Sequence, residues 1–259
     1  MVETAFRDEQ FHLAYPEGVE DHFWTLARNR IVHRLVVEDG PRDPVVLDVG
    51  CGRGLTVAAL RRAGLECWGV EAGDAPVAAD LRSFVFSPRN TFALPEELRS
   101  RVDVVLLLDV VEHLPTPGAF LTDCVRHFPF LSRLVVTVPA RRELWSNYDD
   151  FFGHFARYDR SSLLALLAPL GPRRAEAGYF FHLLYVVLRA QLLFGGARKV
   201  RHRRPTAPSL HRLLGRLFAF EQRRLPRSWY GTSLWARADL GGRLHPGPEV
   251  AARGRSVPG

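Results

Sequence analysis

The sequence is poor in cysteine and lysine and has no long apolar run. Its three cysteines, Cys51, Cys67 and Cys124, are few and odd in number, so no disulfide framework is expected. The first residues, MVETAFRDEQ, are polar and acidic, so no secretory signal is expected either. No apolar stretch reaches the roughly 18 to 20 residues that a transmembrane helix needs. Together these absences predict a cytoplasmic protein.

Arginine supplies nearly all of the basic charge, because the chain has a single lysine. The formal net charge is +7 and the isoelectric point is near 9.9, a balance that favours anionic partners. The basic residues are unevenly distributed, and one group predicts a surface that contacts an anionic partner. This basic cluster consists of Arg198, Lys199, Arg201, Arg203 and Arg204.

Strand-like and helix-like segments alternate along most of the 259 residues. Such alternation predicts an α/β fold, with a mostly parallel sheet and helices on both of its faces. A chain of this length, with 47% hydrophobic residues, suits one domain of this type with additions. The predicted strands cover residues 45–49, 66–71, 102–108, 133–138 and 173–180, and the predicted helices cover 55–62, 75–84, 116–128 and 159–170.

The segment VVLDVGCGRGL is typical of a buried strand that leads into a glycine loop and a helix. Gly50, Gly52 and Gly54 follow a G-x-G-x-G spacing, whereas a dinucleotide-binding loop has its third glycine where Leu55 stands. Asp48, beside the loop, would repel a pyrophosphate and attract a positively charged ligand. S-adenosylmethionine, with its ammonium and sulfonium groups, is such a ligand. A turn that needs glycine only for close packing is the alternative.

At these residues the sequence resembles the class I S-adenosylmethionine-dependent methyltransferases. The order of three further features strengthens the resemblance. They are the lead-in YPEGVEDHFWTLARNR, the acid Glu71 after the second strand and the segment DVVEHL after the fourth. It implies S-adenosylmethionine as cofactor and a Rossmann-like, doubly wound sheet of seven strands, mostly parallel, with an antiparallel last strand at Trp229–Leu240. A helical insertion at residues 181–227 would separate strands six and seven. The implied domains are a helical cap at 1–40, the methyltransferase domain at 41–240 and a disordered tail at 241–259.

The resemblance also implies which residues bind the cofactor. Glu71 is expected to accept hydrogen bonds from both ribose hydroxyls, because a carboxylate is a bidentate acceptor. The sequence departs from the family near Asn90 and Thr91, where an acidic residue usually faces the adenine. Asp109 is expected to face the site. The predicted cofactor-binding residues are Asp48, Gly50, Cys51, Gly52, Gly54, Glu71, Asn90, Thr91 and Asp109.

Residues for the acceptor are expected in the lead-in, in DVVEHL and in the loop after the fifth strand. That loop carries a D-x-x-x-G-H-x-x-x-Y pattern from Asp149, which resembles the substrate-contacting region of small-molecule methyltransferases. Asp149, Asp150 and His154 lack a recognisable ligand set, so no metal site is expected. Glu112 is expected to be structural. The predicted catalytic residues are His154 and His113, and the predicted substrate-binding residues are Trp24, Arg28, Trp145 and Tyr158.

The predicted reaction is methyl transfer to a small-molecule or lipid-linked acceptor by in-line displacement. Orientation alone supplies about 7–11 kcal/mol, and a histidine base adds about 10²–10⁴-fold for an oxygen nucleophile. The acceptor atom and the oligomeric state stay open. A nucleic-acid methyltransferase is disfavoured, because DVVEHL is not the Asn/Asp-Pro-Pro-aromatic run that grips a flipped base. A non-catalytic protein of the same fold is disfavoured by the intact Asp48, glycines and Glu71.

The insertion at residues 181–227 combines the apolar run FHLLYVVLRAQLLF, the basic cluster and an amphipathic helix from Ser209. This combination predicts docking on an anionic membrane, as a peripheral protein at its inner face. In the alternative, the apolar faces pack on the domain and the arginines are solvated.

Overall fold

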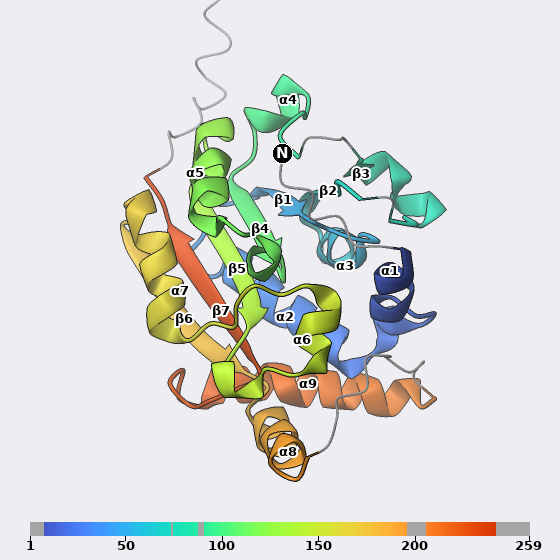
Figure 1. The fold of residues 1–259 in the computed structure, drawn as a ribbon. Coiled ribbons are helices and arrows are strands. Elements are labelled where there is room, and N and C mark those ends of the chain that lie inside the picture. The colour runs from blue at the N-terminus through green and yellow to red at the C-terminus, as the bar shows by residue number, and fades with distance from the viewer. Residues whose placement is uncertain (1–7, 74, 88–90, 196–205, 242–259) are drawn as a thin grey trace, which may run out of the picture.

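The computed structural model describes residues 8–73, 75–87, 91–195 and 206–241. Its centre is a seven-stranded sheet in the order β3-β2-β1-β4-β5-β7-β6 (Figure 1). β7 runs antiparallel to both of its neighbours, while the other pairs are parallel, so the predicted fold class is confirmed. The strands are β1 (Val45–Val49), β2 (Glu66–Val70), β3 (Val85–Phe86), β4 (Val104–Leu108), β5 (Arg133–Pro139), β6 (Arg174–Phe180) and β7 (Ser233–Asp239).

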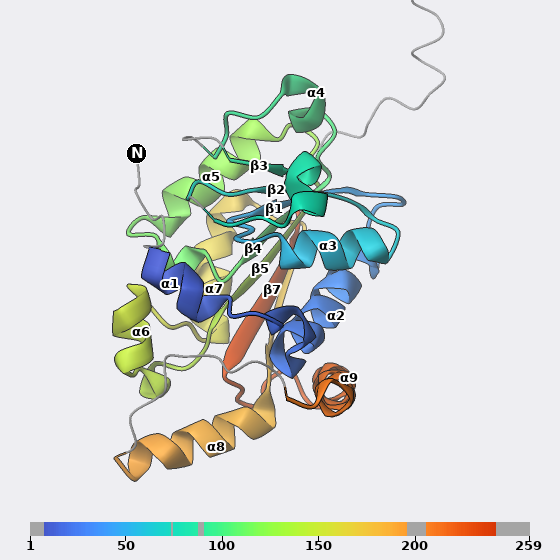
Figure 2. The same cartoon turned by 90° about the vertical axis from the view of Figure 1, so that its right-hand side faces the viewer.

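Helices cover both faces of the sheet, and each face has its own apolar core (Figure 2). α2, α3 and α9 pack on one face, and α5 and α7 pack on the other. All five residues of β1 and all five of β4 are buried, as expected for parallel strands covered on both sides. The helices are α1 (Asp8–Ala14), α2 (Phe23–Val37), α3 (Leu55–Arg62), α4 (Glu96–Arg99), α5 (Pro117–His127), α6 (Asn147–Phe152), α7 (Arg160–Leu167), α8 (His182–Leu193) and α9 (Pro208–Arg224).

Two sequence-based predictions of secondary structure are wrong in part. The helix predicted over residues 75–84 is a 3₁₀ helix, η2, confined to Ala79–Phe84. Pro76 explains the difference, because proline disfavours the α conformation in the residue before it and has no N–H to donate. The last strand begins at Ser233 rather than Trp229, because a turn follows α9 and the Trp229 N–H donates to the Pro226 carbonyl.

The predicted insertion between β6 and β7 contains α8 and α9, which behave differently. α9 packs along α2 and buries Gly215, Phe218 and Gln222. α8 lies at the end of the molecule where β6 finishes, with much of its apolar surface exposed (Figure 2). None of the helices in the described part of the chain combines the length and hydropathy that a membrane crossing needs. The basic cluster and residues 242–259 of the predicted tail lie outside the described residues.

Candidate active site

A cavity of about 790 Å³ lies at the carboxyl ends of the parallel strands. This is the edge at which doubly wound sheets bind ligands. Gly50 follows β1, Glu71 follows β2 and Asp109 follows β4, and all three residues line the cavity. The strand order therefore gathers segments that are far apart in the sequence.

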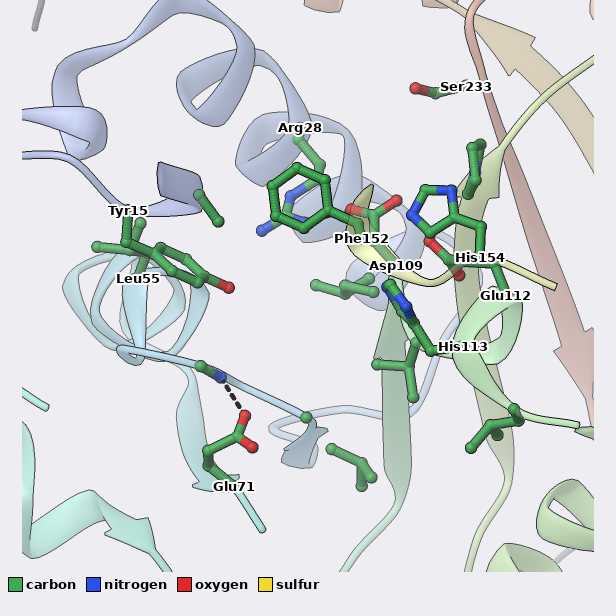
Figure 3. A pocket seen from close by; sticks show the side chains of 18 of the residues that line it. Tyr15, Arg28, Leu55, Glu71, Asp109, Glu112, His113, Phe152, His154 and Ser233 are labelled. Carbon is green, nitrogen blue, oxygen red and sulfur yellow. Dashed lines mark hydrogen bonds and ion pairs between the residues drawn. The ribbon is translucent and has the colours of Figure 1, made fainter. Parts of the chain in front are cut away.

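The cavity has two chemically different ends (Figure 3). We call one the glycine-loop end, and it is formed by Tyr15, Gly50, Gly52 and Glu71. We call the other the histidine end, and it is formed by Glu112, His113 and His154. Arg28 lies between the two ends.

The glycine-loop end is held by main-chain hydrogen bonds. One carboxylate oxygen of Glu71 accepts from the Gly52 N–H at 2.8 Å, and the other accepts from the Gly73 N–H at 2.9 Å. Gly52 has a φ of 53°, and a side chain at this position would collide with the ring of Tyr15. Glycine is therefore required here both by conformation and by space. The result is bare backbone facing the cavity, with Tyr15 above it.

Asp48 lies behind the cavity wall, where it is only 2% exposed. Its Oδ1 has no hydrogen-bond partner among the described residues. Burial raises the pKa of Asp48 to about 7, although the Arg28 guanidinium opposes this shift. Asp48 is thus a buried acid whose charge is sensitive to the pH near neutrality.

Arg28 joins the two ends of the cavity. Its Nη1 donates to Asp109 Oδ2 at 2.6 Å, and its guanidinium carbon lies 4.8 Å from the centroid of the Trp24 ring. Asp109 itself has a φ of 58°, which directs the chain out of β4 and into the 3₁₀ helix η3 (Val111–His113). The ion pair places a cation and an anion side by side in the middle of the cavity.

At the histidine end, a buried carboxylate orients His154. His154 Nδ1 lies 2.8 Å from Asp149 Oδ1, and Arg157 Nε lies 2.7 Å from the same oxygen. Burial opposes ionisation of Asp149, but the hydrogen bonds from His154 and Arg157 outweigh it and lower its pKa to about 2. Because an ionised carboxylate only accepts hydrogen bonds, Nδ1 carries the proton. The nitrogen of His154 that is left for a ligand is therefore Nε2.

His113 and Glu112 complete this end. The rings of His113 and His154 meet edge to face, with centroids 4.7 Å apart. Burial, followed by the neighbouring His154, lowers the pKa of His113 to about 3, so its imidazole is neutral. Burial also raises the pKa of Glu112, which is 1% exposed. Glu112 lines the cavity beside His113, whereas the sequence predicts a structural role for it.

A family model described as "Methyltransferase domain" matches residues 21–171, more than half of the chain. The chain belongs to this family. It is 36% identical over 88 residues to a ubiquinone biosynthesis O-methyltransferase of Pseudomonas fluorescens, a match that covers 31% of this chain and 38% of that protein. The match thus covers well under two thirds of the length of the curated relatives. The predicted class I S-adenosylmethionine-dependent methyltransferase is confirmed.

Two solved structures show the same fold. A possible histamine N-methyltransferase from Thermotoga maritima has a TM-score of 0.52 and 15% identity, covering 88% of this chain and 97% of that chain. A SAM-dependent methyltransferase from Archaeoglobus fulgidus has a TM-score of 0.50 and 19% identity, covering 83% and 93%. At these identities the likeness supports the methyltransferase fold and does not extend to the acceptor.

Most of the predicted site residues of this methyltransferase lie around one cavity. Cys51 packs in the core beneath the loop, and Gly54, with a φ of 80°, begins α3, so neither residue lines the cavity. Asn90 lies outside the described residues. The structure brings together Trp24, Arg28, Gly50, Gly52, Glu71, Thr91, Asp109, His113 and His154.

Two predicted substrate-binding residues do not lie in the cavity. Trp145 is 36% exposed and donates from Nε1 to Asp150 Oδ1 at 2.9 Å, because a capping box at Ser146 starts α6 and turns the preceding residue outward. Tyr158 packs in the core, because its backbone bridges to Ala140 at the end of β5. Tyr148 and Phe152 of α6 line the cavity instead.

Sequence reasoning also missed residues of the cavity wall that come from the N-terminal segment and from α8. Phe11 and Tyr15 come from the N-terminal segment, and Leu184 comes from α8. Tyr15 is the first residue of the lead-in segment, so its position was a usable signal. No local pattern marks Leu184, because its placement depends on where α8 packs.

Proposed function

We propose that this methyltransferase transfers the methyl group of S-adenosylmethionine to a hydroxyl oxygen of a small-molecule or lipid-linked acceptor. The observation that carries the proposal is one continuous cavity with the glycine loop at one end and the Asp149–His154 pair at the other. The relative from Pseudomonas fluorescens, named as an O-methyltransferase, supports an oxygen acceptor.

Glu71 is the residue we assign to the cofactor's ribose. Its two oxygens each accept one main-chain N–H, which fixes the carboxylate in place. Each oxygen keeps a lone pair, so the group can still accept from two adjacent hydroxyls. Asp48 adds negative charge near the loop when it is ionised, which suits a cofactor that carries a sulfonium and an ammonium, whereas Arg28 balances the charge of Asp109.

His154 is the residue we assign to the acceptor. Asp149 fixes its tautomer, so Nε2 is the nitrogen that can engage the acceptor's hydroxyl group as the methyl group arrives. The transfer breaks the bond between sulfur and the methyl carbon and forms a bond from that carbon to the acceptor oxygen. The leaving sulfur becomes a neutral thioether, so alignment of the three atoms is the main requirement.

The proposal is tested with labelled S-adenosylmethionine and separate aqueous and lipid fractions of a cell extract. We expect label to pass into one class of compound, and His154→Ala to lower that transfer about 10²–10⁴-fold with unchanged affinity for S-adenosylhomocysteine. His33→Ala, on α2 and away from the cavity, is the control and should behave like the wild type. Transfer by His154→Ala at the wild-type rate, or loss of its cofactor affinity, would contradict the assignment.

We further propose that α8 docks on an anionic membrane surface and admits an amphiphilic acceptor. Leu183, Val186 and Val187 are 58% to 62% exposed on its outer side, and Phe194 at its end is 91% exposed. Leu184, on the same helix, lines the cavity, so a surface held by α8 would lie beside the opening. The basic cluster follows α8 in the sequence, and each arginine near an anionic surface adds about 1 kcal/mol.

Vesicle co-sedimentation tests the docking. We expect binding to anionic vesicles at low salt, weaker binding at high salt, and loss of binding in the double variant V186E/F194E. The matched control, Val37→Glu, changes an exposed valine at the end of α2. Equal binding to neutral and anionic vesicles would contradict docking on an anionic surface, and no binding to either would contradict membrane docking; neither result bears on the methyl transfer.

A further inference from the structure

Glu112, His113 and His154 each offer one ligand atom, and these atoms all lie within 4.8 Å of one another. Atoms that share a cation at about 2.0–2.2 Å lie about 3 to 4 Å apart, so these three atoms need only a small approach to one another to share one cation. Two imidazoles and one carboxylate, with the remaining positions open to a cavity, form a set typical of divalent transition metals. Local sequence patterns do not indicate this cluster, because its residues come from two separate segments.

The buried carboxyl group of Glu112 is the second observation that indicates a ligand. Glu112 is 1% exposed, and its Oε2 has no hydrogen-bond partner among the described residues. A buried acceptor without a partner costs free energy, and a bound cation would remove that cost. The nearby acids are already compensated, since Asp109 pairs with Arg28 and Asp149 pairs with Arg157.

The surroundings of His154 match those of a metal ligand. Histidines that bind metals usually donate their other ring nitrogen to a carboxylate, which fixes the ring and raises its basicity. Asp149 does this for His154 at 2.8 Å, and Arg157 in turn holds Asp149.

We infer that Glu112, His113 and His154 hold a divalent transition-metal ion whose open side receives the acceptor's oxygen. The inference rests on the proposed function, and it states how His154 acts on the acceptor. A hydroxyl bound to the cation becomes more acidic and gives its proton to water. The resulting alkoxide oxygen takes the methyl group from the sulfonium, and the thioether leaves.

The test is calorimetry with MnCl₂ and ZnCl₂ on chelator-treated protein saturated with S-adenosylhomocysteine. We expect one ion per chain, and an affinity at least about tenfold lower in Glu112→Gln and in His113→Ala. His127→Ala is the matched control: it lines the same cavity but lies outside the cluster, and it should keep wild-type affinity for the ion. Glu112→Gln is close to isosteric, and retained binding of S-adenosylhomocysteine shows that it folds.

The outcomes separate the metal site from the methyl transfer. No binding of either ion, or equal binding by the wild type and both cluster variants, would overturn the site. Chelator treatment that leaves methyl transfer unchanged, while His154→Ala abolishes it, would overturn the role of the ion and leave His154 as a base. Ion binding at the cluster with no transfer to any extract fraction would overturn the proposed function and keep the site.

Discussion

The two ends of the cavity are built on different principles. At the glycine-loop end, the cavity is lined by the main chain of the loop between β1 and α3 and by the carboxylate of Glu71, which directly follows β2. At the histidine end, they are side chains from η3 and from the loop after α6, held in place by Asp149 and Arg157. The first end depends on local backbone geometry, and the second depends on buried charge pairs.

This difference predicts how each end responds to substitution. Loss of the carboxylate of Glu71 should impair ligand binding, because this group is the proposed contact to the ribose and also accepts the main-chain hydrogen bond from Gly52 in the loop. Loss of a supporting charge at the histidine end should also reduce the stability of the fold, because a buried charge is left without its partner.

Glu71→Ala should reduce the affinity for S-adenosylhomocysteine about 10²–10⁴-fold. Two hydrogen bonds to a charged group are lost, each worth about 1.5–3 kcal/mol, and every 1.4 kcal/mol is about tenfold in affinity. Calorimetry measures the change. Glu66→Ala, at the start of β2 and paired with the exposed Arg101, should bind like the wild type. Equal affinity in the two variants would show that the carboxylate of Glu71 does not bind the ribose.

Arg157→Ala should lower the free energy of unfolding by about 3–5 kcal/mol, because Asp149 remains buried without its partner. Urea unfolding measures this change. Arg126→Ala removes an exposed pair with Asp123 and should cost at most about 1 kcal/mol. If both variants lose the same small amount, the histidine end does not depend on its buried charge pair.

Asp48 should make stability fall as the pH rises from about 4 to about 7. In the unfolded chain the carboxyl ionises near its ordinary pKa of 3.8, whereas in the folded chain its pKa is about 7. The folded state therefore holds the extra proton between these values, and the stabilisation is gone above pH 7. Urea unfolding at several pH values should show this fall in the wild type and a flatter profile in Asp48→Asn. Parallel profiles would contradict the shift.

Trp145→Ala should have the smallest effect, with cofactor affinity and methyl transfer within about twofold of the wild type, because Trp145 faces outward from the cavity. Trp24→Ala is the matched comparison. It removes a tryptophan that lines the cavity and stacks on Arg28, so transfer to the extract fraction should fall clearly. A stronger loss in Trp145→Ala than in Trp24→Ala would mean that the loop rearranges around the acceptor.

Prediction from the sequence succeeded where the signal is local. The strand at Val45–Val49, the loop with Gly50 and Gly52, and the start of the helix predicted from residue 159 are short-range patterns, and the structure reproduces them. Trp145 was predicted from its position in the loop after the fifth strand, and Tyr158 from the D-x-x-x-G-H-x-x-x-Y pattern in the same loop. A loop after a strand can turn either way, and here the capping box at Ser146 and the bridge to Ala140 decide the direction.

The sequence by itself determined the fold class, the methyltransferase family and the glycine loop. It could do so because a strand, a tight turn and a helix are specified by neighbouring residues and by their spacing. Only the tertiary structure decided that Glu112 and His113 meet His154, that α9 packs on α2, and that α8 exposes its outer side. Those contacts join distant segments, and which side chains end up buried together depends on how the whole sheet and its helices pack.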